Sequence, residues 1–227
     1  MNDRQKELFH NIVLEHITTA KAIGSEFLVK KYNLEVSSAT TRNDMAELEA
    51  EGLIYQPHTS AGRVPTERGY NYYVANYLSE NPAVGERDKK ILEQAKESGG
   101  QPSGAGAEKM LAKAVAELAD TAVVYCPSKN NTYYTGLSNL LSQPEFADFN
   151  LIYRLTEVVD NFDEVLDGLY DKIKDIEIKI GKDNAFSSDC ASILTKKSGK
   201  VFGLIGPMRM DYERNLGLVT FVRELLN

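Results

Sequence analysis

The sequence predicts an α+β protein of two domains: a small helical domain with a strand and a wing-like loop, then an antiparallel sheet covered by helices. Three observations support this prediction. Apolar residues recur at helical spacing through the first 80 residues, and helical and strand patterns follow one another over 109–227. Between them, the stretch from Ser98 to Ala107 is almost entirely small and polar, which is typical of a linker. We therefore predict domains at 1–80 and 109–227, joined by a linker at 81–108.

The first domain is predicted to contain three helices before its strand. Apolar spacing indicates helices over 3–20 and 26–32, and Ser37 is placed to cap a third helix that runs to about Ala50. Asn33 begins the turn between the last two helices, because Asn tolerates the left-handed backbone that such turns use. Two helices joined by a tight turn at this spacing match a DNA-binding helix-turn-helix, whose second helix enters the major groove by its N-terminus.

Side chains at the start of the third helix have the chemistry that contacts DNA. Hydroxyl groups, a guanidinium group and an amide can all hydrogen-bond to base edges and phosphates. The expected contacts are Ser37, Ser38, Thr40, Arg42 and Asn43. The acids Glu47, Glu49 and Glu51 fall at the other end, away from the predicted contact. The helix dipole and the absence of acids therefore both favour DNA at the helix start.

A strand and an acid-free loop follow this helix, as in a winged helix-turn-helix. Leu53 to Tyr55 is predicted as a strand, and 56–66 as a loop with a His and an Arg at its tip. Wings commonly place a basic side chain on the DNA backbone or in the minor groove. The residues expected to do so are His58, Thr59, Ser60 and Arg63. Thr66 is then placed to cap a further helix, and Ser25 to cap the second helix.

The second domain is predicted to combine helices with antiparallel strands. Helices are expected over 108–121, 144–159 and 162–173, and after the N-cap Asp211. Strands are expected over 123–125, 133–134, 175–180, 191–196 and 200–205. The last two strands are separated by Lys197-Ser198-Gly199, which is a hairpin signal, and Pro127 is expected to end the first strand.

Composition limits the functions open to the chain. The formal net charge of -7 excludes binding of nucleic acid by bulk charge, so any contact with DNA must come from a local arrangement of side chains. The three His residues lie in the first domain, and none pairs with a Cys at ligand spacing. We therefore expect no metal, no cofactor and no catalytic activity. Because no apolar stretch could span a bilayer and two Cys make no disulfide framework, we expect a cytoplasmic protein without membrane contact.

Five blocks of sequence resemble the family of the heat-inducible transcription repressor HrcA. In the first domain they are V-S-S-A-T-T-R-N-D-M-A-E-L-E-A-E-G-L-I at 36–54 and Q-P-H-T-S-A-G-R-V-P-T-E-R-G-Y at 56–70. In the second they are G-L-S-N-L-L-S-Q-P-E-F at 136–146, K-I-G-K-D-N at 179–184 and G-L-I-G-P-M-R-M-D-Y at 203–212. Several separated blocks in the same order are far more specific than one short motif.

This resemblance implies a repressor of heat-shock chaperone operons. It implies a winged helix-turn-helix followed by a GAF-like regulatory and dimerisation domain at 109–227. It further implies a homodimer that binds double-stranded DNA at an inverted-repeat operator, called CIRCE, and the chaperonin GroEL as a partner that supports repression.

The chain departs from the family in two places. It passes from Pro127 to Tyr133 within a few residues, where family members carry early GAF-like strands and an inserted dimerising segment. We therefore expect a reduced GAF-like domain that lacks most of this segment. Thr41 stands where the buried face of the third helix would carry an apolar residue, but its methyl group can face inward while its hydroxyl bonds to the helix backbone.

Two other functions fit the sequence. A small molecule bound in the second domain could set the affinity for DNA, or the helix-turn-helix could be the scaffold of a protein-interaction module with no affinity for DNA. The role of Arg42 is also open. If Arg42 reads a base, its replacement by Ala weakens binding to the operator by roughly 1–3 kcal/mol. If it contacts a phosphate, binding to operator and to random DNA weakens equally.

Overall fold

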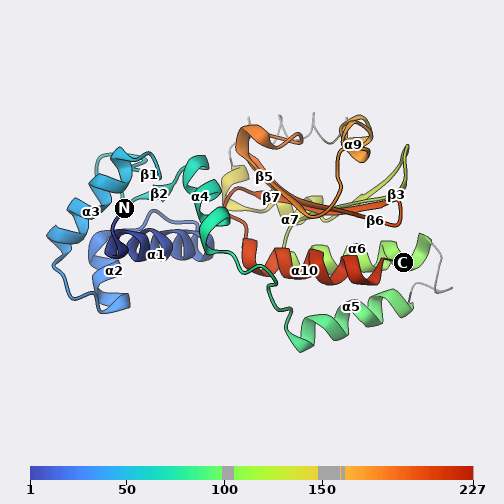
Figure 1. Cartoon of the computed structure of the whole chain (residues 1–227), viewed down its shortest axis with the longest axis horizontal. Coiled ribbons are helices and arrows are strands. Elements are labelled where there is room, and N and C mark those ends of the chain that lie inside the picture. Colours follow the sequence, from blue (N-terminus) through green and yellow to red (C-terminus); the bar gives the residue numbers. More distant parts are fainter. Residues whose placement is uncertain (99–104, 148–158, 160–161, 227) are drawn as a thin grey trace. The chain divides into compact units, whose positions relative to one another are not determined.

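The computed structural model describes residues 1–98, 105–147, 159 and 162–226, and the protein is α+β as predicted (Figure 1). The chain divides into two compact units, Met1–Leu78 and Ser79–Asn227. The elements of the first unit are α1 (Asp3–Thr19), α2 (Ser25–Tyr32), α3 (Ser38–Ala50), β1 (Ile54–Tyr55), β2 (Val64–Pro65) and α4 (Glu67–Tyr77).

Capping residues set where the helices of the first unit begin. The Ser37 hydroxyl accepts a hydrogen bond from the Thr40 N–H at the start of α3, and Thr66 caps α4 in the same way, as predicted. The prediction for α2 is wrong by one residue. Ser25 is the first residue of the helix, and its N-cap is Gly24, which has no side chain to accept a hydrogen bond.

The core of the first unit forms around α1. Its buried apolar side chains include Leu8, Phe9, Ile12 and Val13 of α1, Leu28 of α2, Met45 and Leu48 of α3, and Tyr70 and Tyr73 of α4. Thr41 is also completely buried, and its hydroxyl donates to the Ser37 carbonyl oxygen at 3.1 Å. This contact confirms that Thr41 satisfies its hydroxyl within the helix while it fills an apolar position.

A buried carboxylate fixes α2 against α1. Glu15 is only 4% exposed, and it accepts hydrogen bonds from the Lys31 ammonium group at 2.5 Å and the Tyr32 hydroxyl at 2.7 Å. Burial alone would raise the pKa of Glu15, but these hydrogen bonds outweigh it and lower the pKa. Burial and the carboxylate together raise the pKa of Tyr32 to about 12. The ion pair is therefore present at neutral pH and sets the position of α2.

The loop between α1 and α2 joins the small sheet. Strands β1 and β2 pair antiparallel, and Ile23 extends this pairing through two backbone hydrogen bonds with Arg63, of 2.9 and 2.8 Å. A Cβ on Gly62 would lie 2.3 Å from the Ile23 carbonyl carbon and oxygen, so only glycine allows the two backbones to approach this closely. This pairing holds β2 beside the start of α2.

The second unit is a five-stranded antiparallel sheet with helices on both faces. Its elements are α5 (Glu86–Ser98), α6 (Ala105–Ala119), β3 (Ala122–Ser128), β4 (Asn131–Thr135), α7 (Leu137–Leu141), η1 (Pro144–Ala147), α9 (Phe162–Tyr170), β5 (Glu177–Ile180), η2 (Gly181–Asp183), β6 (Cys190–Lys197), β7 (Lys200–Pro207) and α10 (Tyr212–Leu225). The strand order is β4-β3-β7-β6-β5. The predicted hairpin between β6 and β7 and the Asp211 cap of α10 are confirmed.

Alternation along the strands gives the sheet two buried faces. On β3, Val124 and Cys126 belong to the core that includes side chains of α7, η1 and α9. Tyr125 points to the opposite face, where its hydroxyl donates to Glu108 of α6 at 2.6 Å. Helices α6 and α10 cover this second face, and α5 packs on α6 (Figure 1).

Two sequence predictions for the second unit are wrong. Much of the predicted linker at 81–108 is helix α5, which is held by the buried Leu92 and by a hydrogen bond from Lys96 to the Leu225 carbonyl oxygen at 2.6 Å. Strand β3 continues through Pro127, because a register shift lies between Tyr125 and Ser128, where no N–H is needed. The helix predicted over 144–159 falls mostly outside the described residues.

Candidate nucleic-acid interface

Helix α3 is anchored along its inner face and exposed along its outer face. Asp44 is 4% exposed and accepts two hydrogen bonds from Arg4 of α1, at 2.8 and 2.9 Å. This bidentate ion pair and the buried Met45 and Leu48 fix the rotation of the helix about its axis. Arg42, one step before this face, is exposed. The predicted interface therefore stands on a rigid element.

The exposed face of α3 includes Asn43 and two alanines that sequence reasoning did not single out. Ala39, Asn43 and Ala46 are all exposed and follow one another at helical spacing. Asn43 therefore has small neighbours at Ala39 and Ala46, while the longer side chains of Arg42 and Glu47 are exposed beside it. The Asn43 amide can therefore reach a base edge if α3 enters the major groove.

The hydroxyl groups at the start of α3 serve first in capping. Ser37 is exposed, but its Oγ accepts from the Thr40 N–H at 3.1 Å and lies 3.0 Å from the Thr40 Oγ1. Ser38 and Thr40 are half-buried. The first turn of α3 contains no acid, as the sequence indicates, so its positive dipole end is not neutralised.

A hydrogen-bonded turn forms the tip of the loop between β1 and β2. The Gln56 side-chain amide donates to the carbonyl oxygens of Thr59 and Ala61, at 3.0 and 2.9 Å. The Ala61 N–H donates to the His58 carbonyl oxygen at 2.8 Å. His58, Thr59 and Ser60 are exposed on this fixed turn, so three of the four predicted wing residues are available to a partner.

Arg63 is not at the loop tip, contrary to the sequence prediction. Its side chain is 14% exposed and its Nε lies 2.9 Å from Glu49 Oε2. The other Glu49 oxygen accepts from the Gln56 N–H at 3.0 Å. Glu49 was expected to lie away from the interface, but it ties α3 to the base of the loop. The sequence separation between Glu49 and Arg63 leaves no local signal for this ion pair.

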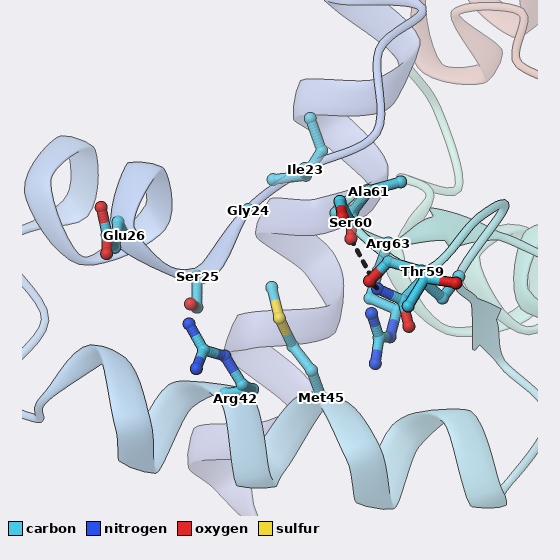
Figure 2. A pocket seen from close by; sticks show the side chains of 12 residues that line it. Ile23, Gly24, Ser25, Glu26, Arg42, Met45, Thr59, Ser60, Ala61 and Arg63 are labelled. Carbon is cyan, nitrogen blue, oxygen red and sulfur yellow. Dashed lines mark hydrogen bonds between the residues drawn. The ribbon is translucent and has the colours of Figure 1, made fainter.

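A groove of about 530 Å³ joins these parts (Figure 2). It lies between the start of α2, the middle of α3 and the loop, and Ser25, Arg42, Met45, Thr59 and Arg63 are among its lining residues. Figure 2 shows the Arg42 guanidinium group rising from α3 toward the Ser25 hydroxyl, with Met45 between Arg42 and the loop. Sequence reasoning named Arg42, Thr59 and Arg63 but missed Ser25.

Two further properties of the described residues bear on function. Among them, no group of three or more His, Cys, Asp or Glu side chains is arranged to hold a metal ion. No helix in the same residues is long and apolar enough to cross a membrane.

Comparison with known proteins identifies the family. The HrcA protein C-terminal domain matches residues 74–216, which is more than half of the chain. The chain belongs to the HrcA family. A solved structure with a related fold, described as a hypothetical protein at 2.2 Å resolution, has a TM-score of 0.76 and 21% identity over 99% of this chain and 97% of that chain.

Curated HrcA relatives match the chain in two ways. The heat-inducible transcription repressor HrcA of Caldanaerobacter subterraneus is 26% identical over 337 aligned positions, which cover 100% of this chain and 96% of the relative. The repressors of Thermoanaerobacter pseudethanolicus and Mycobacteroides abscessus are 46% and 53% identical over 88 and 91 residues. In these two, the match spans only 26% and 27% of the relative's length.

The HrcA relatives are longer than this chain, as the family resemblance implies. The alignment with the Caldanaerobacter repressor has 337 positions, whereas this chain has 227 residues. Strands β3 and β4 are joined directly by Lys129 and Asn130, and Asn130 has a φ of 61°. The chain between Pro127 and Tyr133 is therefore a short hairpin, at the place where we expected the inserted segment to be missing.

Proposed function

We propose that this HrcA-family chain is a sequence-specific DNA-binding repressor of heat-shock chaperone operons. In this proposal the first unit is a winged helix-turn-helix, with α2 and α3 as its two helices and the β1–β2 loop as its wing. Helix α3 enters the major groove, and His58, Thr59 and Ser60 contact the DNA backbone or minor groove. Arg63 supports the wing through Glu49.

One observation carries this proposal beyond family membership. Arg42 and Asn43 are exposed near the acid-free start of α3, and Arg42 shares one groove with the β1–β2 loop. The pairing of Ile23 with Arg63 and of Arg63 with Glu49 holds this loop against α3. A helix and a loop fixed in this way can engage the major groove and the adjacent backbone at the same time.

The dimer and its partners are proposed from the resemblance to the HrcA family. An inverted repeat presents two equal half-sites, which match a protein with two-fold symmetry. We propose that the second unit is a reduced GAF-like domain that mediates dimerisation, and that GroEL supports repression as the family resemblance implies. A chain with net charge -7 depends on its local contacts for affinity, so binding will be sensitive to salt.

Fluorescence anisotropy tests the proposal. Binding is measured to a duplex that carries the CIRCE inverted repeat and to a scrambled duplex of equal length, over a series of salt concentrations. We expect a preference for the repeat of about 10³ or more, with two protomers on each duplex. Equal and weak binding to both duplexes would contradict sequence-specific recognition of this operator.

The two alternatives predict different results. A protein-interaction module binds neither duplex, even at low salt. A regulator controlled by a small molecule is stabilised in a thermal shift assay by one member of a metabolite panel. A ligand at a hundred times its Kd would add about 2.7 kcal/mol to the free energy of unfolding.

A further inference from the structure

The start of α2 is an uncapped helix N-terminus. Its N-cap Gly24 has φ and ψ of -89° and 150° and offers no side-chain acceptor. The first N–H used by the helix is that of Leu28, which donates to the Gly24 carbonyl oxygen at 3.2 Å. Within the described chain, no hydrogen bond satisfies the N–H groups of Ser25, Glu26 and Phe27. These groups and the helix dipole together favour a bound anion.

Ser25 independently indicates a ligand at this place. The residue is only 7% exposed and lines the groove between α2, α3 and the loop. Its hydroxyl forms no hydrogen bond with the residues that the structure describes, and it faces the groove rather than the packed interior of the unit. Figure 2 shows this hydroxyl directed into the groove. A ligand with acceptor oxygens would satisfy it.

Arg42 supplies a positive charge on the opposite wall. It is exposed in the groove, and it forms no ion pair within the described part of the chain. Arg63 lines the same groove but is neutralised by Glu49. Glu26 is the acid that also lines the groove, and in Figure 2 its carboxylate lies apart from the Ser25 hydroxyl and the Arg42 guanidinium group.

We propose that the N-terminus of α2, the Ser25 hydroxyl and the Arg42 guanidinium group together bind one phosphate group of the DNA backbone. This inference rests on the proposed function and adds a site to it. Hydroxyl, backbone N–H and guanidinium donors that converge from two helices match the acceptor oxygens of a phosphodiester. Arg42 then positions the protein on DNA, and base reading falls to Asn43.

The glycine at position 24 fits this role better than a structural one. A Cβ built on Gly24 meets no atom within 4 Å, and its φ is available to any residue. Asp or Asn would therefore fit there and would cap α2, which stabilises a helix relative to a residue without a capping group. Glycine forgoes that stability but leaves the N–H groups open to an anion.

The opposite effects of one substitution on stability and on binding test the site. Gly24→Asp should raise the Tm of the full chain, because the new carboxylate caps α2. The same carboxylate occupies the phosphate site, so affinity for the CIRCE duplex and for the scrambled duplex should fall equally, by about tenfold or more. Gly24→Asn caps the helix without charge and should lower both affinities less. Ser25→Ala and Arg42→Ala should also lower the affinities for the two duplexes by equal factors.

Glu26→Gln is the matched control. It removes an acid from the same helix turn, so it should lower the Tm slightly and strengthen binding to both duplexes. In Gly24→Asp, the loss of one phosphate contact should also reduce the slope of log K against log salt by about 0.9. A Gly24→Asp variant with a higher Tm and unchanged affinity for both duplexes would overturn the proposal.

Inorganic phosphate separates this inference from the proposed function. At constant ionic strength, replacing chloride by phosphate should raise the Tm of the parent chain but not that of Gly24→Asp. If the parent chain binds no duplex yet shows this difference, the DNA-binding proposal fails and the site binds a free oxyanion instead. If phosphate stabilises both proteins equally and Gly24→Asp binds DNA like the parent, the site does not exist.

Discussion

Partners decide what each polar side chain of the interface can do. Arg42 and Arg63 have the same chemistry, but Arg63 is largely buried against Glu49, whereas Arg42 is exposed in the groove. Ser37 is exposed, yet its hydroxyl already caps α3. Asn43 is exposed on the outer face, and its side chain has no hydrogen-bond partner among the described residues. Residue type alone therefore identifies candidate contacts, but the partners of each side chain in the fold decide which of them are available to DNA.

Asn43 is expected to read a base. An Asn side chain can donate to and accept from adenine at once, and a good bidentate contact contributes about 1–3 kcal/mol of discrimination. Asn43→Ala should therefore weaken binding to the CIRCE duplex by that amount and leave binding to the scrambled duplex almost unchanged. Anisotropy titrations of both duplexes measure this difference. Asn76→Ala, an exposed Asn on α4, is the control and should change neither affinity. An equal loss on both duplexes would assign Asn43 to the backbone.

At the scale of elements, the sequence predicted what depends on neighbours in the chain. Asn33 has the left-handed φ of 49° expected for the turn after α2, and Ser37, Thr66 and Asp211 cap the helices that follow them. These signals act over three or four residues. The Ile23–Arg63 pairing joins residues far apart in the chain, so no local pattern predicted that the α1–α2 loop supports the β1–β2 loop.

The same limit explains the missed features of the interface and of α5. Glu49 follows the helical pattern of an exposed acid, and only the tertiary fold brings Arg63 to it. Gly24 and Ser25 are ordinary loop and capping residues in the sequence, and their place opposite Arg42 depends on the packing of α2 on α3. The linker prediction failed where Leu92 provides a single buried anchor in a charged segment.

The close approach of two backbones makes Gly62 essential for the loop. Gly62→Ala would place a Cβ 2.3 Å from the Ile23 carbonyl group, so β2 must move away and the pairing weakens. We expect a loss of about 1–3 kcal/mol in the free energy of unfolding, as for other overpacked sites, measured by chemical denaturation. Gly168 is an exposed residue of α9, and a Cβ there meets no atom, so Gly168→Ala should instead stabilise the protein by about 0.5–1 kcal/mol. Equal effects of the two substitutions would show that the clash relaxes freely.

At the scale of the whole molecule, the proposed function requires two chains to act together on DNA. The net charge of -7 gives one chain little nonspecific attraction to DNA. In the proposed function, the first unit of each chain contacts one half-site. A dimer makes the second half-site contact intramolecular, so its affinity benefits from a high effective concentration. Strands β3 and β4 are joined directly by Lys129 and Asn130. The resemblance implies that family members dimerise through a segment inserted in this region, so the dimer that we propose for this chain forms through other surfaces.

Duplexes with one half-site test whether the shortened chain still forms this dimer. If it does, a duplex with a single half-site should bind about 10²–10⁴ times more weakly than the full repeat, the range expected for loss of avidity. Insertion of half a helical turn between the half-sites should weaken binding similarly, because it rotates them to opposite sides of the DNA. Anisotropy gives the affinities, and analytical ultracentrifugation of the complex gives the number of protomers. One protomer on the full repeat, with affinity equal to that for a half-site, would mean that the chain binds DNA as a monomer.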